Sequence, residues 1–172
     1  MQLISIPNHP QTAQTHLTIG IAFALGLQYG NTNDNDDRSM YHYEKALAIY
    51  EKNSSHFDVA RTLQLIGTDY GQRAMYNLSM SRYKKALSLR LNYYAKNDLD
   101  LATLYHSIGS TYEDGFQAYT EALNNYEKAL VHFTAASLPP DDSKLIETEN
   151  DINRVKELIS STVSSPSGPL DQ

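Results

Sequence analysis

The chain repeats one pattern of residues at a spacing of 42 positions, the offset between the segments 58–70 and 100–112. A second matched pair of segments, 83–87 and 126–130, follows these two. A third and more divergent copy lies upstream, and its matched segments are 14–23 and 43–47. Repeats of this length are supersecondary units that bury their apolar faces only against one another, so the pattern indicates a stacked array.

Each copy contains two amphipathic helices. In the first half, Leu63, Ile66 and Tyr70 recur at steps of three and four residues, which places them on one helical face. The second half keeps the same period, and the breaker-containing segments 71–77 and 114–115 separate the halves in two successive copies. The alternating β-branched pattern of strands is absent. We therefore predict an all-α fold of antiparallel helix hairpins.

No single hairpin of this kind buries both of its faces, so we expect an α-solenoid of about three repeats closed by a capping helix. The segment 141–160 suits the capping role because it carries one apolar stripe and no second helix follows it. The repeat domain is expected to cover 11–160. The parts are a linker-like segment at 1–10, repeats near 11–55, 57–97 and 99–137, the capping helix at 141–160 and a disordered tail at 161–172.

The composition argues against several classes of function. The 172 residues include no cysteine, which excludes a thiol nucleophile, a disulfide and a cysteine-ligated metal. A net charge of −6 disfavours a nucleic-acid surface, and no apolar run is long enough to cross a membrane. Phosphate-loop, nucleophile-elbow and zinc-protease motifs are absent, and the six histidines show no ligand spacing. We predict a cytoplasmic protein that is not an enzyme, has no cofactor or metal, and binds neither nucleic acid nor membrane.

One acidic segment imitates part of a calcium-binding loop. Asn33, Asn35 and Asp37 alternate along the chain, and Glu44 stands at the twelfth place. Arg38, however, occupies the position at which such a loop requires glycine. We interpret the segment as a polar turn made by an insertion.

The repeated residues resemble those of the tetratricopeptide repeat (TPR) family. Each of the two clearest copies has an aliphatic residue before a glycine, an aromatic residue three positions after it, and then a small residue, an aromatic residue and alanine in the second helix. The period is longer than the ~34 residues of the standard unit. Together with the proline-containing junctions at 7–10 and 138–140, this period is similar to the kinesin light chain type. The resemblance implies a right-handed TPR superhelix with a non-catalytic role in protein interaction.

Small and large residues face one another at the positions that define the repeat. Gly67 and Gly109 are expected where the two helices of a hairpin approach closely, and a side chain there would overpack the contact by about 1–3 kcal/mol. The alanines act in the same way, and each tyrosine fills the space left open, contributing about 1.5–3 kcal/mol. The structural positions are Gly20, Gly67, Gly109, Tyr70, Tyr112, Tyr83, Tyr126, Ala86 and Ala129.

The resemblance implies that a partner peptide or helix binds along the concave face, which is formed by the first helix of each repeat. The positions that correspond to this face are Arg61, Gln64, Thr68, Gln72, Thr103, His106, Ser110, Glu113, Glu147, Asn150 and Arg154. Each residue taken alone is equally consistent with a solvated helix face, so the hypothesis concerns the set.

Two motifs that set partner choice in related repeats are missing. Kinesin light chain repeats commonly carry an Asn pair before the aliphatic-glycine step, whereas this chain has Gln64-Leu65, His106-Ser107 and Leu17-Thr18 there. The Lys and Asn set that grips a terminal carboxylate in chaperone-binding members is absent as well. The sequence therefore predicts a protein or peptide partner without naming it.

Two alternatives stay open at this point. The segment from Pro7 to Pro10 resembles an inter-repeat junction, which suggests that the chain is the regulatory or targeting part of a larger enzyme or motor-associated protein. The other alternative is self-association, because the first copy has an apolar face where the groove is expected. This N-terminal apolar face consists of Leu17, Ile21, Ala24 and Leu25.

Overall fold

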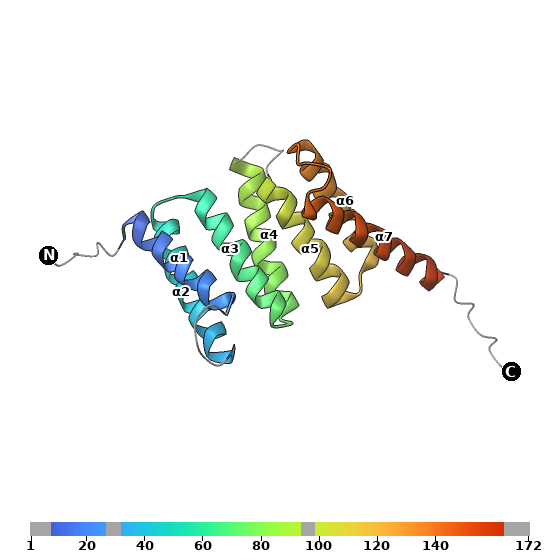
Figure 1. Ribbon diagram of the computed structural model, residues 1–172. Helices are drawn as coiled ribbons and strands as arrows, with labels where there is room; N and C mark the ends of the chain where they lie inside the picture. The colour runs from blue at the N-terminus through green and yellow to red at the C-terminus, as the bar shows by residue number, and fades with distance from the viewer. Residues whose placement is uncertain (1–7, 27–31, 94–98, 164–172) are drawn as a thin grey trace. The chain divides into compact units, whose positions relative to one another are not determined.

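The computed structural model describes residues 8–26, 32–93 and 99–163, which are helical for most of their length and contain no strand (Figure 1). The helices are α1 (Pro10–Ala24), α2 (Thr32–Lys52), α3 (His56–Gln72), α4 (Tyr76–Tyr93), α5 (Leu99–Phe116), α6 (Tyr119–Ala135) and α7 (Ser143–Val163). The prediction of an all-α fold of helix hairpins is confirmed. Residues 1–7 of the expected linker, residues 164–172 of the expected tail, and the side chains of Asn33 and Asn35 lie outside the described residues.

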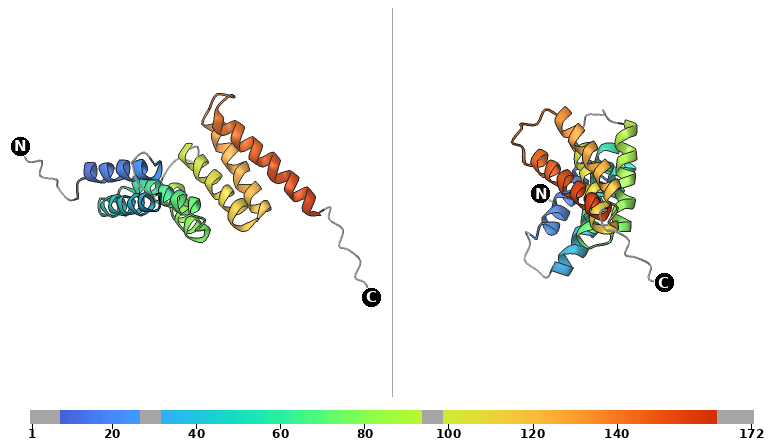
Figure 2. Two further views of the ribbon diagram at one scale, coloured as in Figure 1. Left: turned by 60° about the horizontal axis from the view of Figure 1, so that its bottom comes forward. Right: turned by 90° about the vertical axis from the view of Figure 1, so that its right-hand side faces the viewer.

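The chain divides into two compact units, Met1–Ala95 and Lys96–Gln172. In the first unit, α1 packs against α2 and α3 packs against α4, and α2 also packs against α3 (Figures 1 and 2). In the second unit, α5 packs against α6 and α7 packs against α6. The first unit therefore consists of two hairpins, and the second consists of one hairpin followed by a single helix. No helix in the described part of the chain is long and apolar enough to span a membrane.

Glycine does not end α5, although the sequence pattern had suggested a break at 114–115. Gly115 lies inside α5, which continues to Phe116. Four described residues other than glycine are left-handed and each follows a helix: Ser54 after α2, Ala74 after α3, Gln117 after α5 and Ser137 after α6, with φ of 54°, 56°, 52° and 58°. Gly26, with φ of 65°, follows α1. A glycine inside a helix costs only about 1 kcal/mol relative to alanine. Packing of the hairpin outweighs this cost, so the helix extends past it.

A glycine on the first helix of each hairpin rests against a tyrosine ring on the second. The pairs, with the distance from a Cβ added to the glycine to the nearest ring carbon, are Gly20 and Tyr43 at 2.7 Å, Gly67 and Tyr83 at 2.6 Å, and Gly109 and Tyr126 at 2.8 Å. Such distances are far below van der Waals contact, so a larger residue has to displace the ring. The glycines of the repeat pattern are therefore the points where helix and ring meet directly.

The other repeat positions differ in burial. Ala86 and Ala129 are fully buried, as expected for residues that let two helices approach. Tyr70 and Tyr112, which we expected to fill the same space as Tyr83, are only half-buried. Tyr112 lies at the edge of the core that α6 and α7 share, rather than inside it.

The N-terminal apolar face is not a continuous exposed patch, which corrects the residue set proposed for self-association. Leu17 has no exposed surface, because Ala13, Leu17 and Gly20 form the buried stripe of α1, the helix that packs along α2. Ile21 and Ala24 are half-buried, and only Leu25 is largely exposed, at 67%. The periodicity identified the apolar residues of α1 correctly but assigned Leu17 to the wrong side.

Candidate functional site

The predicted positions on α3 lie along one side of the helix. Arg61, Thr68 and Gln72 are exposed, and Gln64 is half-buried. The hydroxyl of Thr68 lies 3.1 Å from the hydroxyl of Tyr83 and donates to the carbonyl of Gln64 at 3.1 Å. Thr68 is thereby held next to the tyrosine that packs on Gly67, while the amide groups of Gln64 and Gln72 remain available at the surface.

A buried carboxylate that sequence reasoning missed connects the two hairpins of the first unit. Asp69 on α3 is only 3% exposed, and it accepts a hydrogen bond of 3.0 Å from the Ser39 hydroxyl on α2. Arg73, one turn later, lies 3.6 Å from the second carboxylate oxygen. Burial, together with the nearby charge of Asp69, raises the pKa of Tyr43 to about 12. The matching position of the next repeat, Thr111, is buried as well, so this position faces the core in both copies.

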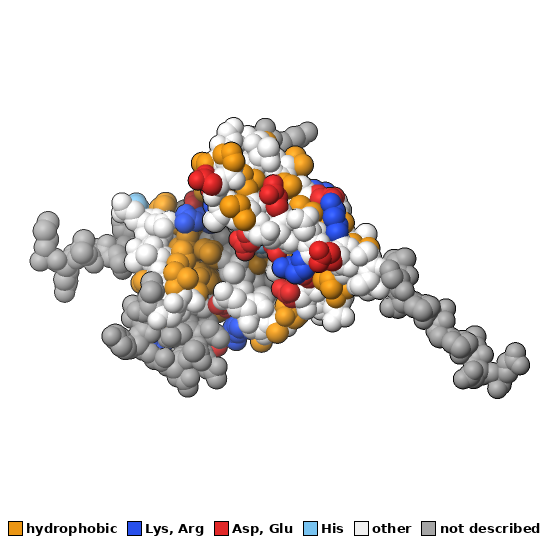
Figure 3. Space-filling model, turned by 45° about the vertical axis from the view of Figure 1, so that its right-hand side comes forward, with side chains coloured by type: hydrophobic (Ala, Val, Ile, Leu, Met, Phe, Trp, Pro, Cys, Tyr) orange, Lys and Arg blue, Asp and Glu red, His pale blue; other side chains and the backbone are white. Residues whose placement is uncertain are grey.

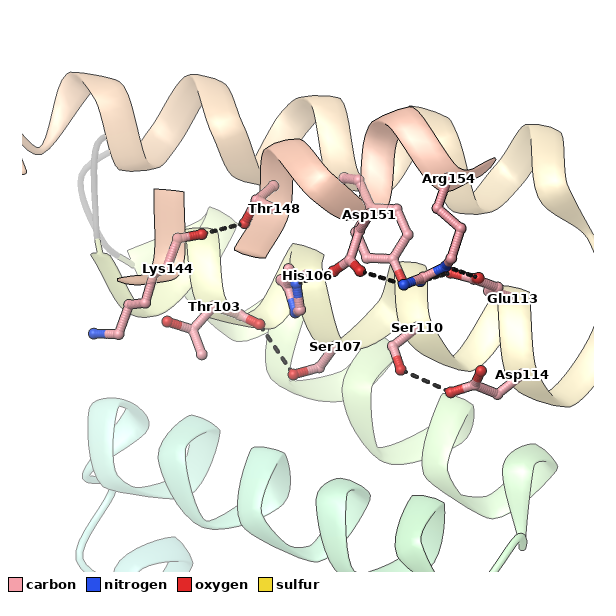
Figure 4. Close-up of polar contacts among 11 residues, drawn as sticks. Thr103, His106, Ser107, Ser110, Glu113, Asp114, Lys144, Thr148, Asp151 and Arg154 are labelled. Atoms are coloured by element: carbon pink, nitrogen blue, oxygen red, sulfur yellow. Dashed lines mark hydrogen bonds and ion pairs between the residues drawn. The ribbon is translucent and has the colours of Figure 1, made fainter. Parts of the chain in front are cut away.

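On α5, several predicted side chains bond to their own helix. Thr103 donates to the carbonyl of Leu99 at 3.0 Å. Ser110 donates to the carboxylate of Asp114 at 3.1 Å (Figure 4). Thr103, Ser110 and His106 are half-buried. Only His106 of these three reaches across to α7.

Five side chains form a polar network across α5, α6 and α7 (Figure 4). Arg154 on α7 donates through Nε and Nη2 to the two carboxylate oxygens of Glu113 on α5, at 2.8 and 2.7 Å. The Tyr126 hydroxyl on α6 donates to Glu113 at 2.9 Å. Asp151 accepts from Nη1 of Arg154 at 2.8 Å and lies 2.8 Å from Nε2 of His106. The network ties the last helix to the hairpin before it.

The ionisation of this network is set by its hydrogen bonds. Burial on its own would raise the pKa of Glu113, but the hydrogen bonds from Arg154 and Tyr126 outweigh it, and the pKa is lowered from its usual 4.5. The same hydrogen bond and the charge of Glu113 hold the pKa of Arg154 above its usual value. Burial, followed by the bond to Glu113, raises the pKa of Tyr126. At neutral pH the network therefore holds an ionised Glu113–Arg154 pair and a neutral tyrosine.

Glu113 and Arg154 are therefore paired with each other, although Arg154 keeps 52% of its side chain exposed. Glu113 is only 9% exposed, and both of its oxygens are occupied by Arg154 and Tyr126. All three hydrogen-bonding nitrogens of Arg154 point to Glu113 or Asp151. The repeat pattern could not predict this pairing, because it contains no information on how α7 is rotated against α5. Asp151, which holds His106 and Arg154, was missed.

The structure resembles solved structures of known proteins, although their sequences share little identity with this chain. The nearly identical TPR-like repeats of a kinesin light chain type from Podospora anserina superpose with a TM-score of 0.65 at 11% identity, covering 90% of this chain and 70% of that one. The N-terminal domain of stress-induced protein-1 (STI-1) from C. elegans has a TM-score of 0.57 at 15% identity, covering 87% and 96%. The chain has a TPR fold. BtubC (BKLC) from P. vanneervenii is a further structural match, with a TM-score of 0.54 at 14% identity and coverage of 95% and 70%.

The TPR assignment comes from structure, because no family profile and no curated protein matches this sequence. The expected resemblance to TPR proteins of the kinesin light chain kind is confirmed by these structural matches. At identities of 11–15% they establish the fold.

Two hollows in the TPR surface differ in their relation to the predicted positions. One, of about 190 Å³, is bordered by Thr103, His106 and Glu147, which were all predicted, and by Lys144. The other, of about 440 Å³, lies in the first unit between α3 and α4 near Leu63, and none of the predicted positions borders it. On the face drawn in Figure 3, acidic and basic side chains are interspersed with hydrophobic ones. The structure thus brings three predicted residues of α5 and α7 together around one small hollow.

Proposed function

We propose that this TPR protein is a non-catalytic interaction scaffold that binds an extended peptide or a helix of a partner protein. The proposed contact face consists of the accessible positions of α3, α5 and α7, which correspond to the concave face of TPR arrays. Stacked hairpins support such a role because they hold rows of side chains on rigid helices. We expect the scaffold to act in the cytoplasm.

The observation that carries the proposal is the hollow of about 190 Å³ beside His106. Pockets for small-molecule ligands usually measure about 300–1,000 Å³, so this hollow is too small for such a ligand and suits one side chain of a peptide. Its walls offer a carboxylate from Glu147, an amine from Lys144 and the Thr103 hydroxyl. These groups provide both donors and acceptors to a polar side chain.

Surface substitutions on α3 and α7 test the proposal. The full chain is used to capture partners, and each identified partner is then measured with the purified pair by calorimetry. Gln64→Ala, Gln72→Ala and Glu147→Ala are combined, and the last of these borders the hollow. Because binding energy concentrates in few contacts, we expect affinity to fall at least about tenfold, which is about 1.4 kcal/mol.

The matched control replaces three exposed polar residues on the second helices, Lys45, Lys84 and Asn124, by alanine. Affinity is expected to stay unchanged in this control, since these residues lie on α2, α4 and α6. Equal affinities of the triple variant and the unmodified protein would reject the proposed face. A loss confined to the control variant would move the binding face to the second helices.

A further inference from the structure

We propose that His106, Glu147 and Asp151 form a binding site for a divalent transition-metal ion such as Zn²⁺, which would join α7 to α5. One ligand atom from each of the three residues lies within 4.8 Å of the other two. His106 comes from α5, and Glu147 and Asp151 come from successive turns of α7. This inference does not depend on the proposed partner binding.

The spacing of the ligand atoms fits one ion. Nε2 of His106 and the Asp151 oxygen Oδ2 are 2.8 Å apart. Two neighbouring ligands of an ion at about 2.1 Å from each lie about 3.0–3.4 Å apart, so these two atoms need to separate only slightly. Glu147 lies one helical turn before Asp151, on the same side of α7. The side chain of Glu147 is exposed, so it can turn and bring its carboxylate oxygen closer to the ligand atoms of His106 and Asp151.

Neighbouring residues orient two of the three ligands. Arg154 donates from Nη1 to Oδ1 of Asp151 at 2.8 Å, which leaves Oδ2 directed at His106. The imidazole ring of His106 lies against the ring of Tyr126, with centroids 5.2 Å apart. Ligands held in this way by a second layer of contacts bind metal more tightly than mobile ones. In the metal-bound state the ion takes the place of the hydrogen between His106 and Asp151.

Charge and space also favour a cation here. The three carboxylates of Glu113, Asp151 and Glu147 outnumber the cationic groups of Arg154, which is shared between Glu113 and Asp151, and of Lys144, so the cluster keeps a net negative charge. The hollow of about 190 Å³ that His106 and Glu147 border has space for water as a further ligand. Three protein ligands plus water is a common coordination of Zn²⁺.

The ligand set also predicts selectivity. One imidazole and two carboxylates suit Zn²⁺ and similar transition metals, whereas Mg²⁺ and Ca²⁺ prefer a shell made only of oxygen atoms. Because the ligands come from two helices of the second unit, an ion bound to the folded chain stabilises the packing of α7.

Titration of the full chain with ZnCl₂, followed by calorimetry and by thermal unfolding, tests the site. We expect one equivalent to bind and Tm to rise, while MgCl₂ at the same concentration leaves Tm unchanged. Glu147→Gln removes one ligand at an exposed position and is therefore compatible with folding. Loss of one ligand is expected to weaken Zn²⁺ binding at least about tenfold. The matched control, Glu149→Gln, removes the same charge from an exposed position of α7 and should bind Zn²⁺ as before.

A pair of histidines in the first unit requires its own control. His16 and His42, in the first unit, have their Nδ1 atoms 2.8 Å apart and offer a competing place for Zn²⁺. The titration is therefore repeated in a His42→Gln variant, where the one-equivalent binding should persist. The inference is wrong if the chain binds no Zn²⁺, if Glu147→Gln and Glu149→Gln bind it equally, or if His42→Gln abolishes binding.

Discussion

The guanidinium of Arg154 binds both carboxylate oxygens of Glu113, through hydrogen bonds of 2.8 and 2.7 Å between residues 41 positions apart in the chain. The Tyr126 hydroxyl donates to the same carboxylate. Tyr126 is also the ring on which Gly109 rests. The ion pair and the hairpin core thus share one tyrosine, so the attachment of α7 and the packing of α5 on α6 depend on each other.

Removing the Glu113 charge should destabilise the protein in a pH-dependent way. At pH 7, Glu113→Gln is expected to lower the free energy of unfolding by about 1–3 kcal/mol, because Arg154 and Tyr126 lose a charged acceptor. The pKa of Glu113 is lower in the folded chain than its usual 4.5, so its contribution is complete above that pH. As pH falls below 4.5 and through the folded pKa, the contribution is lost. Urea unfolding at pH 7 and at pH 3 measures both values.

The exposed Glu149 provides the reference for this prediction. Glu149→Gln should change the free energy of unfolding by less than about 0.5 kcal/mol at either pH. A constant difference between Glu113→Gln and the unmodified chain across the acid range would show that the carboxylate gains nothing from Arg154 on folding.

Two glycines of α3 should respond to alanine in opposite directions. Gly67→Ala places a Cβ 2.6 Å from the Tyr83 ring and should destabilise the protein by about 1–3 kcal/mol. At Gly71 the nearest atom, the Ser79 hydroxyl oxygen, is 3.5 Å from an added Cβ, which is ordinary contact. Gly71→Ala should therefore stabilise the helix by about 0.5–1 kcal/mol. Thermal unfolding of the two variants distinguishes them, and equal losses at both positions would contradict the close contact.

The alkaline stability of the first unit should depend on Tyr43. Its folded pKa is about 12 against the usual 10.0, so the unfolded chain releases this proton first. Stability is complete below pH 10 and decreases between pH 10 and about 12. Tyr43→Phe should show a smaller decrease over this interval, measured by urea unfolding at several pH values. An identical pH dependence in both proteins would contradict the buried state of this hydroxyl.

Leu17 in α1 and Leu25 just after the end of α1 represent a core residue and a surface residue. Leu17 is fully buried, and Leu17→Ala should cost about 2–5 kcal/mol. Leu25 is 67% exposed, so Leu25→Ala should change stability by less than about 0.5 kcal/mol. Chemical unfolding measures both. A small effect at Leu17 would restore the exposed apolar face that the sequence pattern indicated.

Much of the fold was predictable because its determinants are local and repeated. Leu63, Ile66 and Tyr70 recur at helical steps, and the same steps recur 42 positions later. The glycine and the tyrosine of each hairpin stand 16 and 17 positions apart in the two clearest copies, so Gly67 with Tyr83 and Gly109 with Tyr126 could be identified as contact positions. The turns were less predictable, since left-handed Ala74 and Gln117 carry no turn signal.

The chain's own sequence therefore determined the helices, their pairing into hairpins and the residues at which each pair meets, because all of these depend on neighbours within one repeat. Only the tertiary structure decided that Glu113 and Arg154 neutralise each other, that Asp151 faces His106 across 45 positions, and that Leu17 is buried. These contacts depend on the rotation of one helix against another, and a periodic pattern leaves this rotation undetermined. Packing of side chains between helices sets it.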